Sequence, residues 1–298
     1  MTGASPDSSD LVEITLALDG EAAEAVCALF RQHGGGAVVE SRPGDDGSPP
    51  EHWVSTYIPA DDPEARARLE IGLWHLGRIY PMPETGIRTV ARADWAEAWK
   101  QHYRPLRVGA RFVVTPSWID PRPTGDALVI RLDPGMAFGT GLHPTTQLCL
   151  AALERVVAPG DAVLDVGTGS GILAIAAMLL GASRAVGVDL DPAAAEIAAA
   201  NARANGVLVE TLVGGLDQAP SDAYDVVVAN LLAATVTDLA RPLLGRTRPG
   251  GTCVASGILS EQAPAVTSAL QAAGFHPPVT ASSGDWVALT VRRPAARR

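Results

Sequence analysis

The stretch from Asp165 to Gly171 (DVGTGSG) constrains the fold more than any other part of the chain. It follows the apolar run 162–164 and precedes the long apolar stretch 172–180. Glycines let a backbone turn tightly and approach a ligand closely, because no Cβ is in the way. A helix that begins there presents unpaired N–H groups to a polar or anionic ligand. The order strand, glycine turn and helix therefore predicts the ligand loop of a doubly wound α/β domain.

Length and charge limit the classes of protein that the chain can belong to. Its 298 residues suffice for two domains with separate cores, and 47% hydrophobic residues indicate a globular protein. A formal net charge of −10 argues against direct binding of nucleic acid, which needs a basic surface. The same charge suits an acidic enzyme that meets a basic protein, because opposite charges speed their encounter.

The cysteines and the N-terminus point to a reduced, soluble protein. Cys27, Cys149 and Cys253 are far apart and form no CxxC pair, so we expect neither a disulfide framework nor a metal site. The N-terminus has neither the basic start nor the apolar core of a signal peptide. The apolar stretch around 172–182 is too short to span a bilayer. We expect a cytoplasmic monomer that does not contact the membrane.

Residues 1–92 have the pattern of a small α+β domain. Four strands and two helices alternate in the order βαββαβ, at 11–18, 21–33, 37–39, 53–58, 62–79 and 87–91. This order is typical of a ferredoxin-like domain, and Asp61 or Asp62 is the expected N-cap of its second helix. The domain has no cluster of catalytic residue types. Recognition of a partner and a purely structural or dimerising role both stay open.

Residues 93–108 are expected to connect this domain to a second one at 109–298. A short helix at 94–103 places Trp95 and Trp99 on one face, as at a domain junction. Strands at 111–118 and 127–132 flank a Pro-rich turn, and we predict that they form a hairpin attached to the second domain.

A loop rich in Gly, Pro and small hydroxyl residues lies at 133–146, before a helix at 147–157. One interpretation is a tight loop in which Thr145 or Thr146 caps the helix. The other is a lid over a cofactor, with an apolar face from Phe138 and a hydroxyl from Thr140 or Thr145, and the length of the loop favours it. His143 alone fits a satisfied polar residue better than a ligand.

Two further strands end in polar residues suited to a nucleoside ligand. Asp189 follows the strand 185–188, about 20 residues after the glycines, where a carboxylate accepts two hydrogen bonds from a ribose diol. Asp191 precedes a proline and is the expected N-cap of the next helix. Asn230 ends the strand 224–229, at the sheet edge where chemistry occurs in α/β proteins, although asparagine is also a common turn residue.

A dinucleotide-binding site is the main competing interpretation, but the glycine spacing argues against it. That fingerprint is G-x-G-x-x-G, whereas Ile172 occupies the sixth position here and the pattern is D-x-G-x-G-x-G. Asp165 can hold backbone N–H groups of the loop or meet a cationic amino group of a cofactor. The pattern resembles the first motif of Rossmann-like methyltransferases, which bind S-adenosylmethionine.

Taken together, the motifs resemble the ribosomal protein L-eleven (L11) methyltransferase family of the PrmA type, over nearly the whole chain. Four segments carry the resemblance in order and spacing, namely PGMAFGTGLHPTT at 134–146, LDVGTGSGIL at 164–173, GVDLDP at 187–192 and ANLL at 229–232. The fold that this implies is a Rossmann-like class I methyltransferase domain preceded by a small ferredoxin-like domain.

The resemblance also implies an activity and its residues. Family members use S-adenosylmethionine to methylate lysine side chains and the N-terminal amine of ribosomal protein L11, a basic protein that their small domain holds. Asn230 is the expected catalytic residue, and we expect no metal. The expected cofactor-binding residues are Phe138, Thr140, Thr145, Asp165, Gly167, Gly169, Asp189 and Asn230.

Two other functions stay open. The first is an amine methyltransferase that acts on another protein or on a small amine. The second is a ribosome-associated binding protein that does not catalyse a reaction. The intact Asp165, glycine loop, Asp189 and Asn230 argue against loss of activity. The remaining elements expected are a strand at 208–213, a helix at 233–244, a turn at 249–251, a strand at 252–256, a helix at 261–273, an antiparallel pair at 275–280 and 286–291, and a frayed basic tail at 292–298.

Overall fold

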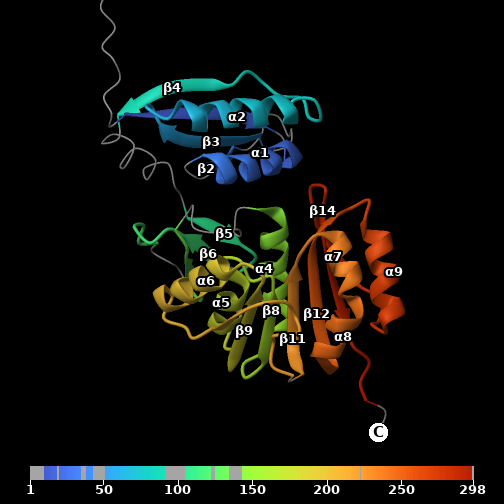
Figure 1. The fold of residues 1–298 in the computed structure, drawn as a ribbon. Coiled ribbons are helices and arrows are strands. Elements are labelled where there is room, and N and C mark those ends of the chain that lie inside the picture. Colours follow the sequence, from blue (N-terminus) through green and yellow to red (C-terminus); the bar gives the residue numbers. More distant parts are fainter. Residues whose placement is uncertain are drawn as a thin grey trace, which may run out of the picture. The chain divides into compact units, whose positions relative to one another are not determined.

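The chain divides into two compact units, Met1–Tyr103 and Arg104–Arg298. The computed structural model describes residues 10–18, 20–34, 38–42, 51–91, 105–121, 125–133, 143–221 and 223–296. The helix expected at 94–103, with Trp95 and Trp99, and the loop 134–142 lie outside these residues. Each unit has its own sheets and its own core, and Figure 1 draws the smaller unit in blue to cyan and the larger unit in green to red.

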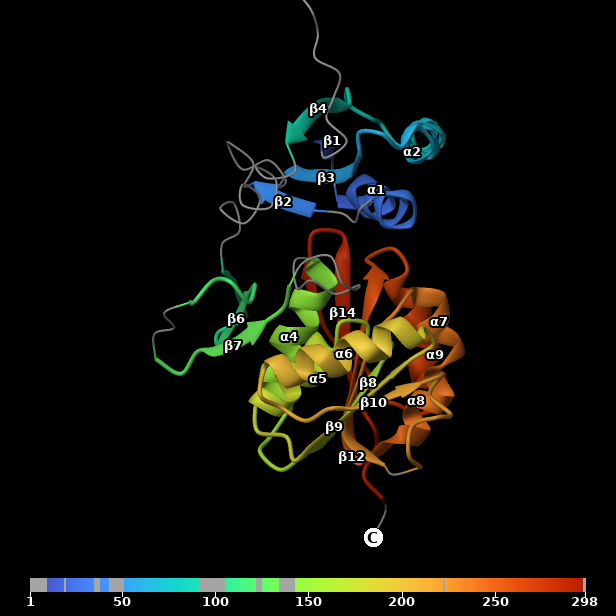
Figure 2. The ribbon, with the colours of Figure 1, turned by 60° about the vertical axis from the view of Figure 1, so that its left-hand side comes forward.

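The smaller unit has the predicted ferredoxin-like fold. Its antiparallel sheet has the strand order β2-β3-β1-β4, and both helices lie on one face (Figure 2). The elements are β1 (Asp10–Leu18), α1 (Gly20–His33), β2 (Val38–Arg42), β3 (Glu51–Pro59), α2 (Pro63–Leu76) and β4 (Gly86–Ala91). Of the two predicted caps of α2, Asp61 and Asp62, the structure has Asp62, whose side chain accepts a hydrogen bond from the Ala65 N–H at 2.9 Å.

The core of the smaller unit follows from the alternation in β1. Val12, Ile14, Leu16 and Leu18 point to the helical face and are buried against α1, where Phe30 is fully enclosed. Residues at every second position of a strand share one face of the sheet, so this spacing fixes which side the helices cover.

The larger unit is built on a seven-stranded sheet with the order β10-β9-β8-β11-β12-β14-β13. The strands are β8 (Ala162–Val166), β9 (Arg184–Asp189), β10 (Glu210–Val213), β11 (Tyr224–Asn230), β12 (Thr247–Leu259), β13 (Val279–Ser283) and β14 (Trp286–Arg292). Neighbours from β10 to β12 pair in parallel, whereas β14 pairs antiparallel with both β12 and β13. The order reverses between β8 and β11, which is the position where doubly wound sheets bind ligands.

Helices cover both faces of this sheet. α4 (Pro144–Val156), α5 (Ile172–Leu179) and α6 (Pro192–Ala204) lie on one side, and α7 (Ala233–Asp238), α8 (Ala240–Arg246) and α9 (Ala263–Ala273) lie on the other (Figure 1). Strand β8 shows why, since Val163 packs toward the first group while Leu164 and Val166 pack toward the second. A strand that is buried on both faces has a mostly apolar sequence without alternation.

A separate three-stranded sheet corrects the predicted hairpin. β5 (Leu106–Val108), which falls within the expected connector, pairs antiparallel with β6 (Phe112–Thr115). However, β6 pairs in parallel with β7 (Leu128–Arg131), so the two predicted strands do not form a hairpin. The Pro-rich segment between them is 12 residues long, and a connection of this length can cross over and return in the same direction.

Proline also explains a second difference, in the helix predicted at 233–244. The structure has two helices there, α7 and α8, which meet at Leu239. Pro242 has no N–H to donate, and its ring clashes with a helical carbonyl four residues earlier. A new helix that starts at Ala240 places Pro242 in its first turn, where no N–H bond is needed.

The C-terminal segment is more ordered than the frayed tail that we expected. Arg292 belongs to β14 and pairs with Thr252. The Arg293 guanidinium donates to the carbonyls of Leu244 and Thr247, both at 2.8 Å. The segment 249–251, predicted as a turn, lies within β12 at a break in its pairing with β11, since Tyr224 pairs with Thr247 and Val226 pairs with Thr252.

Two absences hold for the part of the chain that the structure describes. None of its helices is long and apolar enough to cross a membrane. It also has no group of three or more His, Cys, Asp or Glu side chains that could bind a metal ion. All three cysteines are buried and reduced.

Candidate cofactor and active site

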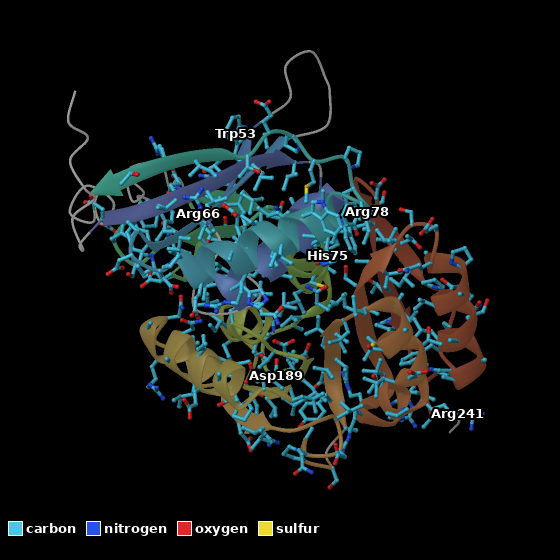
Figure 3. The ribbon with its side chains drawn as sticks, turned by 45° about the horizontal axis from the view of Figure 1, so that its top comes forward. Trp53, Arg66, His75, Arg78, Asp189 and Arg241 are labelled. Atoms are coloured by element: carbon cyan, nitrogen blue, oxygen red, sulfur yellow. The ribbon has the colours of Figure 1, made fainter. Side chains whose placement is uncertain are left out.

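Five of the predicted site residues meet at the carboxyl edge of the large sheet. Asp165 is in β8, Asp189 ends β9 and Asn230 ends β11, and these three strands are neighbours in the sheet. Gly167 and Gly169 lie in the loop that leaves β8 for α5. Figure 3 labels Asp189 in the larger unit. Because the three strands are parallel neighbours, their carboxyl ends bring together residues that are up to 65 positions apart in the sequence.

The glycine loop needs glycine for conformational reasons. Gly167, Gly169 and Gly171 have φ angles of 72°, 53° and 81°, a left-handed region that side chains with a Cβ rarely adopt. The loop is tied to the neighbouring strand because the N–H groups of Gly167 and Thr168 both donate to the Val188 carbonyl, at 2.8 and 3.0 Å. This fixes the backbone of the loop against β9.

Close packing around the loop leaves no room for side chains at two of these glycines. A Cβ at Gly171 would lie 3.0 Å from the Cβ of Ala198, so the start of α5 can approach α6 closely. A Cβ at Gly167 would lie 2.5 Å from Cδ2 of Leu231, which covers the loop from the end of β11. Asn201 on α6 donates a hydrogen bond of 2.8 Å to the Ser170 carbonyl and so ties the loop to α6.

Asp165 is a buried carboxylate with one oxygen in use. Its Oδ2 accepts from the Thr168 hydroxyl at 2.7 Å and from the Ala174 N–H at 3.3 Å. Its Oδ1 is buried and has no hydrogen-bond partner among the described residues. Burial raises the pKa of Asp165 to about 7, in spite of the bonds from Thr168 and Ala174, and the charge of Asp189 adds to the rise. Such an oxygen is suited to a cationic or hydrogen-bond-donating group of a ligand.

Asp189 is held in place by two backbone bonds. Oδ2 accepts from the Gly169 N–H at 2.9 Å, and Oδ1 accepts from the Asp191 N–H at 3.0 Å. A carboxylate oxygen has two lone pairs, so each oxygen can accept one more bond, as the two hydroxyls of a ribose require. Asp191 is the N-cap of α6 as predicted, because its side chain accepts from the Ala193 N–H at 2.9 Å.

Asn230 is oriented by α4. Its Nδ2 lies 3.4 Å from the Thr146 hydroxyl oxygen, to which it donates. The backbone beyond it is fixed by a bond of 2.9 Å from the Leu231 N–H to the Ser256 carbonyl on β12. With its amide nitrogen turned to α4, the side-chain carbonyl of Asn230 remains available to accept a hydrogen bond.

The start of α4 differs from the prediction. The helix begins at Pro144, and its N-cap is His143, whose Nδ1 accepts from the Thr145 N–H at 3.3 Å. The predicted caps Thr145 and Thr146 are instead buried in the first turn, with the Thr145 hydroxyl 2.7 Å from His143 Nδ1. Proline at the first helical position places the cap at His143, two or three residues earlier than predicted. His143 is thus a satisfied polar residue, and its ring meets that of Trp286 edge to face at 4.9 Å.

The residues present fit S-adenosylmethionine better than a dinucleotide. The strand ends place the carboxyl groups of Asp165 and Asp189 beside the glycine loop, where acceptor oxygens of this kind offer no favourable contact to a pyrophosphate. They favour a ligand with hydroxyl groups and a cationic amino group. Of the other predicted residues, Phe138 and Thr140 lie outside the described residues.

Sequence reasoning missed two residues of this site. Thr146 was considered only as a helix cap, although it faces Asn230, and Asn201 was not singled out at all. The segment HPTT contained the signal for Thr146, since two residues in a first helical turn can point toward a neighbouring strand. Nothing in the local sequence marks Asn201, which is 31 residues from its partner Ser170.

Comparison with known proteins agrees with this geometry. The family model of ribosomal protein L11 methyltransferase (PrmA) matches residues 10–294. The chain is 40% identical to the ribosomal protein L11 methyltransferase of Herpetosiphon aurantiacus over 317 residues, which cover 95% of this chain and 99% of that protein. It is 43% identical to that of Pelotomaculum thermopropionicum over 303 residues, with 94% and 98% covered.

A solved structure agrees as well. The crystal structure of the ribosomal protein L11 methylase from Lactobacillus delbrueckii subsp. bulgaricus is 35% identical and superposes with a TM-score of 0.61. The match covers 64% of this chain and all of that one. From these matches and its Rossmann-like methyltransferase fold, we conclude that the chain belongs to the ribosomal protein L11 methyltransferase family.

Proposed function

We propose that the chain is an S-adenosylmethionine-dependent N-methyltransferase that methylates lysine side chains and the N-terminal amine of ribosomal protein L11. The observation that carries the proposal is the meeting of Asp165, Asp189 and Asn230 around a glycine loop at the carboxyl edge of the sheet. Membership of the family, whose members are named for this substrate, supports the choice of L11. The reaction takes place in the cytoplasm, where ribosomal proteins are made.

Each residue has a role toward the cofactor in this proposal. Asp189 accepts bonds from the ribose hydroxyls, and Oδ1 of Asp165 faces the cationic amino group. Gly167 and Gly169 let the backbone approach closely, Phe138 and Thr140 contribute from the segment before α4, and Thr145 contributes from its first turn. When bound, S-adenosylmethionine supplies a methyl group on a positively charged sulfur.

Asn230 orients the amine that receives the methyl group. An amine attacks only in its neutral form, and a lysine in water has a pKa of about 10.4, so burial in a dry site helps by lowering that pKa. Asparagine is too weak a base to remove a proton. Its carbonyl accepts a hydrogen bond from the amine and aims the nitrogen lone pair, so that orientation provides much of the rate. Thr146 holds the amide in the orientation this requires.

The residues after Asn230 favour a flexible aliphatic amine. Leu231 packs over Gly167, and the side chain of Leu232 is 72% exposed beside the strand end. These positions have no aromatic ring on which a flat nucleobase could stack. Lysine side chains and an N-terminal amine fit this surface. The smaller unit, Met1–Tyr103, holds the protein that presents them to the catalytic unit, Arg104–Arg298.

Mass spectrometry of purified ribosomal protein L11 after incubation with the enzyme and S-adenosylmethionine tests the proposal. We expect mass gains in steps of one methyl group, located on lysine side chains and the N-terminus, and their loss in Asn230→Ala. Cofactor binding measured by calorimetry shows whether the variant is still folded. Methylation of nucleic acid without methylation of any protein amine contradicts the proposal.

A further inference from the structure

The smaller unit has an apolar surface on α2 and β4 that its own core does not use. Four large apolar side chains are exposed there, with exposed fractions of 59% for Ile71, 60% for Trp74, 72% for Ile79 and 47% for Ile87. We call these four residues the α2–β4 surface. Ile71, Trp74 and Ile87 are neighbours, because Trp74 shares one hollow with Ile87 and a second with Ile71, while Ile79 follows α2 in the chain. Scattered exposed apolar residues are normal, but a contiguous group marks a site of interaction.

Two hollows make this surface concave. The first has a volume of about 370 Å³ and lies between the end of α2 and β4, and its apolar lining includes Ile14, Leu16, Leu73 and Ile87. The second, on the outer side of α2, has a volume of about 470 Å³ and includes Ile71. Trp74 and Glu70 line both hollows, so these two side chains form the ridge between them, and Trp74 is its apolar part.

The pattern of α2 explains why this face remains open. The helix buries only Ala65 and Leu69 fully, and a surface helix normally has polar residues on its opposite face. Here Ile71 and Trp74 occupy that outer face instead. Exposing an indole ring to water forfeits the free energy that its burial gives, which suggests that something else covers it.

The ridge is also held in one position. The Arg78 guanidinium lies over the Trp74 ring at 5.3 Å from its centroid, and the His75 ring meets it edge to face at 5.0 Å. Figure 3 shows His75 and Arg78 together at the same end of α2, away from Arg66. A fixed aromatic side chain loses little freedom on binding and is therefore a good anchor.

Charge indicates the kind of partner. Residues 1–103 contain eight basic and 17 acidic residues, a formal net charge of −9, whereas residues 104–298 contain 15 and 16, a net charge of −1. Nearly all the negative charge of the chain thus belongs to the smaller unit. Around α2 the arginines are engaged, since Arg66 pairs with Glu70 and Arg68 with Glu64, while Arg78 lies over Trp74.

We propose that the α2–β4 surface docks the basic protein substrate, which places an apolar side chain against Trp74 and basic residues near the acidic groups of the unit. This inference rests on the proposed function, since it assigns the docking of the same substrate to one face of the smaller unit. Apolar contact at Trp74 supplies affinity, and the charge of −9 speeds association and selects a basic partner.

Steady-state methylation of ribosomal protein L11 by Trp74→Ala in the full chain tests this. We expect KM for L11 to rise about 30-fold, the loss typical of a central tryptophan in an interface, with kcat and the cofactor Kd unchanged. Leu208→Ala is the matched control, because Leu208 is an apolar side chain 84% exposed in the larger unit, and its KM should equal that of the wild type. KM of the wild type should also rise with ionic strength.

Other outcomes overturn the proposal. An unchanged KM in Trp74→Ala, with normal methylation, refutes the docking surface but leaves the proposed function intact. Loss of self-association in the variant shows that a second copy of the chain covers the surface. A changed kcat or cofactor Kd shows that the chain itself covers it. A wild-type enzyme that does not methylate L11 refutes the proposed function instead.

Discussion

The carboxyl group of Asp165 makes the stability of the larger unit depend on pH. Burial raises the pKa of Asp165 from 3.8 to about 7, against the hydrogen bonds from Thr168 and Ala174. An acid with a raised pKa in the folded state binds its proton more tightly there, so stability falls as pH rises from about 4 to about 7. The full loss is about 4 kcal/mol, and about 2.5 kcal/mol of it falls between pH 5 and pH 8.

Asp165→Asn removes this titration while it keeps the shape of the side chain. The new Oδ1 can accept the bonds from Thr168 and Ala174, and Nδ2 takes the place of the oxygen that has no partner among the described residues. A change of 1 kcal/mol shifts the Tm of a domain of this size by about 2–4 °C. We therefore expect the Tm of the variant minus that of the wild type to be about 5–10 °C larger at pH 8 than at pH 5.

Thermal unfolding followed by circular dichroism at the two pH values measures this difference without cofactor. Asp191→Asn is the control, because Asp191 is an exposed N-cap of α6 and asparagine caps a helix equally well. Its Tm should follow that of the wild type at both pH values. If Asp165→Asn shows the same pH dependence as the wild type, to within about 1 °C, the carboxyl group is not destabilised by burial and the reasoning is wrong.

Three further predictions concern packing, capping and the ion pair of a buried glutamate with an exposed arginine. Gly167→Ala should lower stability by about 2–4 kcal/mol through its left-handed backbone and the clash with Leu231, and adding Leu231→Ala should recover less than half in urea unfolding. His143→Ala should lower the Tm of the larger unit by about 2–4 °C through the lost cap of α4. Burial alone raises the pKa of Glu13, but hydrogen bonds from Arg88 and Tyr57 lower it overall. Glu13→Gln should therefore destabilise the smaller unit at pH 7 by about 1–3 kcal/mol. The difference in stability between wild type and variant, measured by urea unfolding, should shrink as pH falls toward 3.

Much of the fold could be predicted from local sequence signals. Alternation in 11–18 predicted β1, and glycine turns between apolar runs predicted the order of strands and helices around β8. Asp191 was recognised as a cap, and Asp61 or Asp62 as another, because a cap is a local feature that needs a short polar side chain at the start of a helix. The convergence of Asp165, Asp189 and Asn230 followed from the general rule that parallel strands end at one edge.

The errors came from interactions that local sequence does not specify. The direction of β7 relative to β6 depends on a crossover of 12 residues, and a Pro-rich segment looks the same whether it turns back or crosses. The break between α7 and α8 required weighing Pro242 against a continuous apolar pattern. Thr146 and Asn201 act on partners 84 and 31 residues away, so only the folded chain reveals their role.

The most direct test of the central claim, that the carboxyl edge of the large sheet holds the cofactor, is isothermal titration of S-adenosylhomocysteine into the wild type and Asp189→Asn. Asparagine keeps the size of the side chain but replaces one acceptor oxygen by a donor and removes the charge. We predict one bound molecule per chain and an affinity at least about 10-fold weaker in the variant, as the loss of bonds to a charged group requires. Absence of binding by the wild type, or equal affinity in both proteins, contradicts the claim.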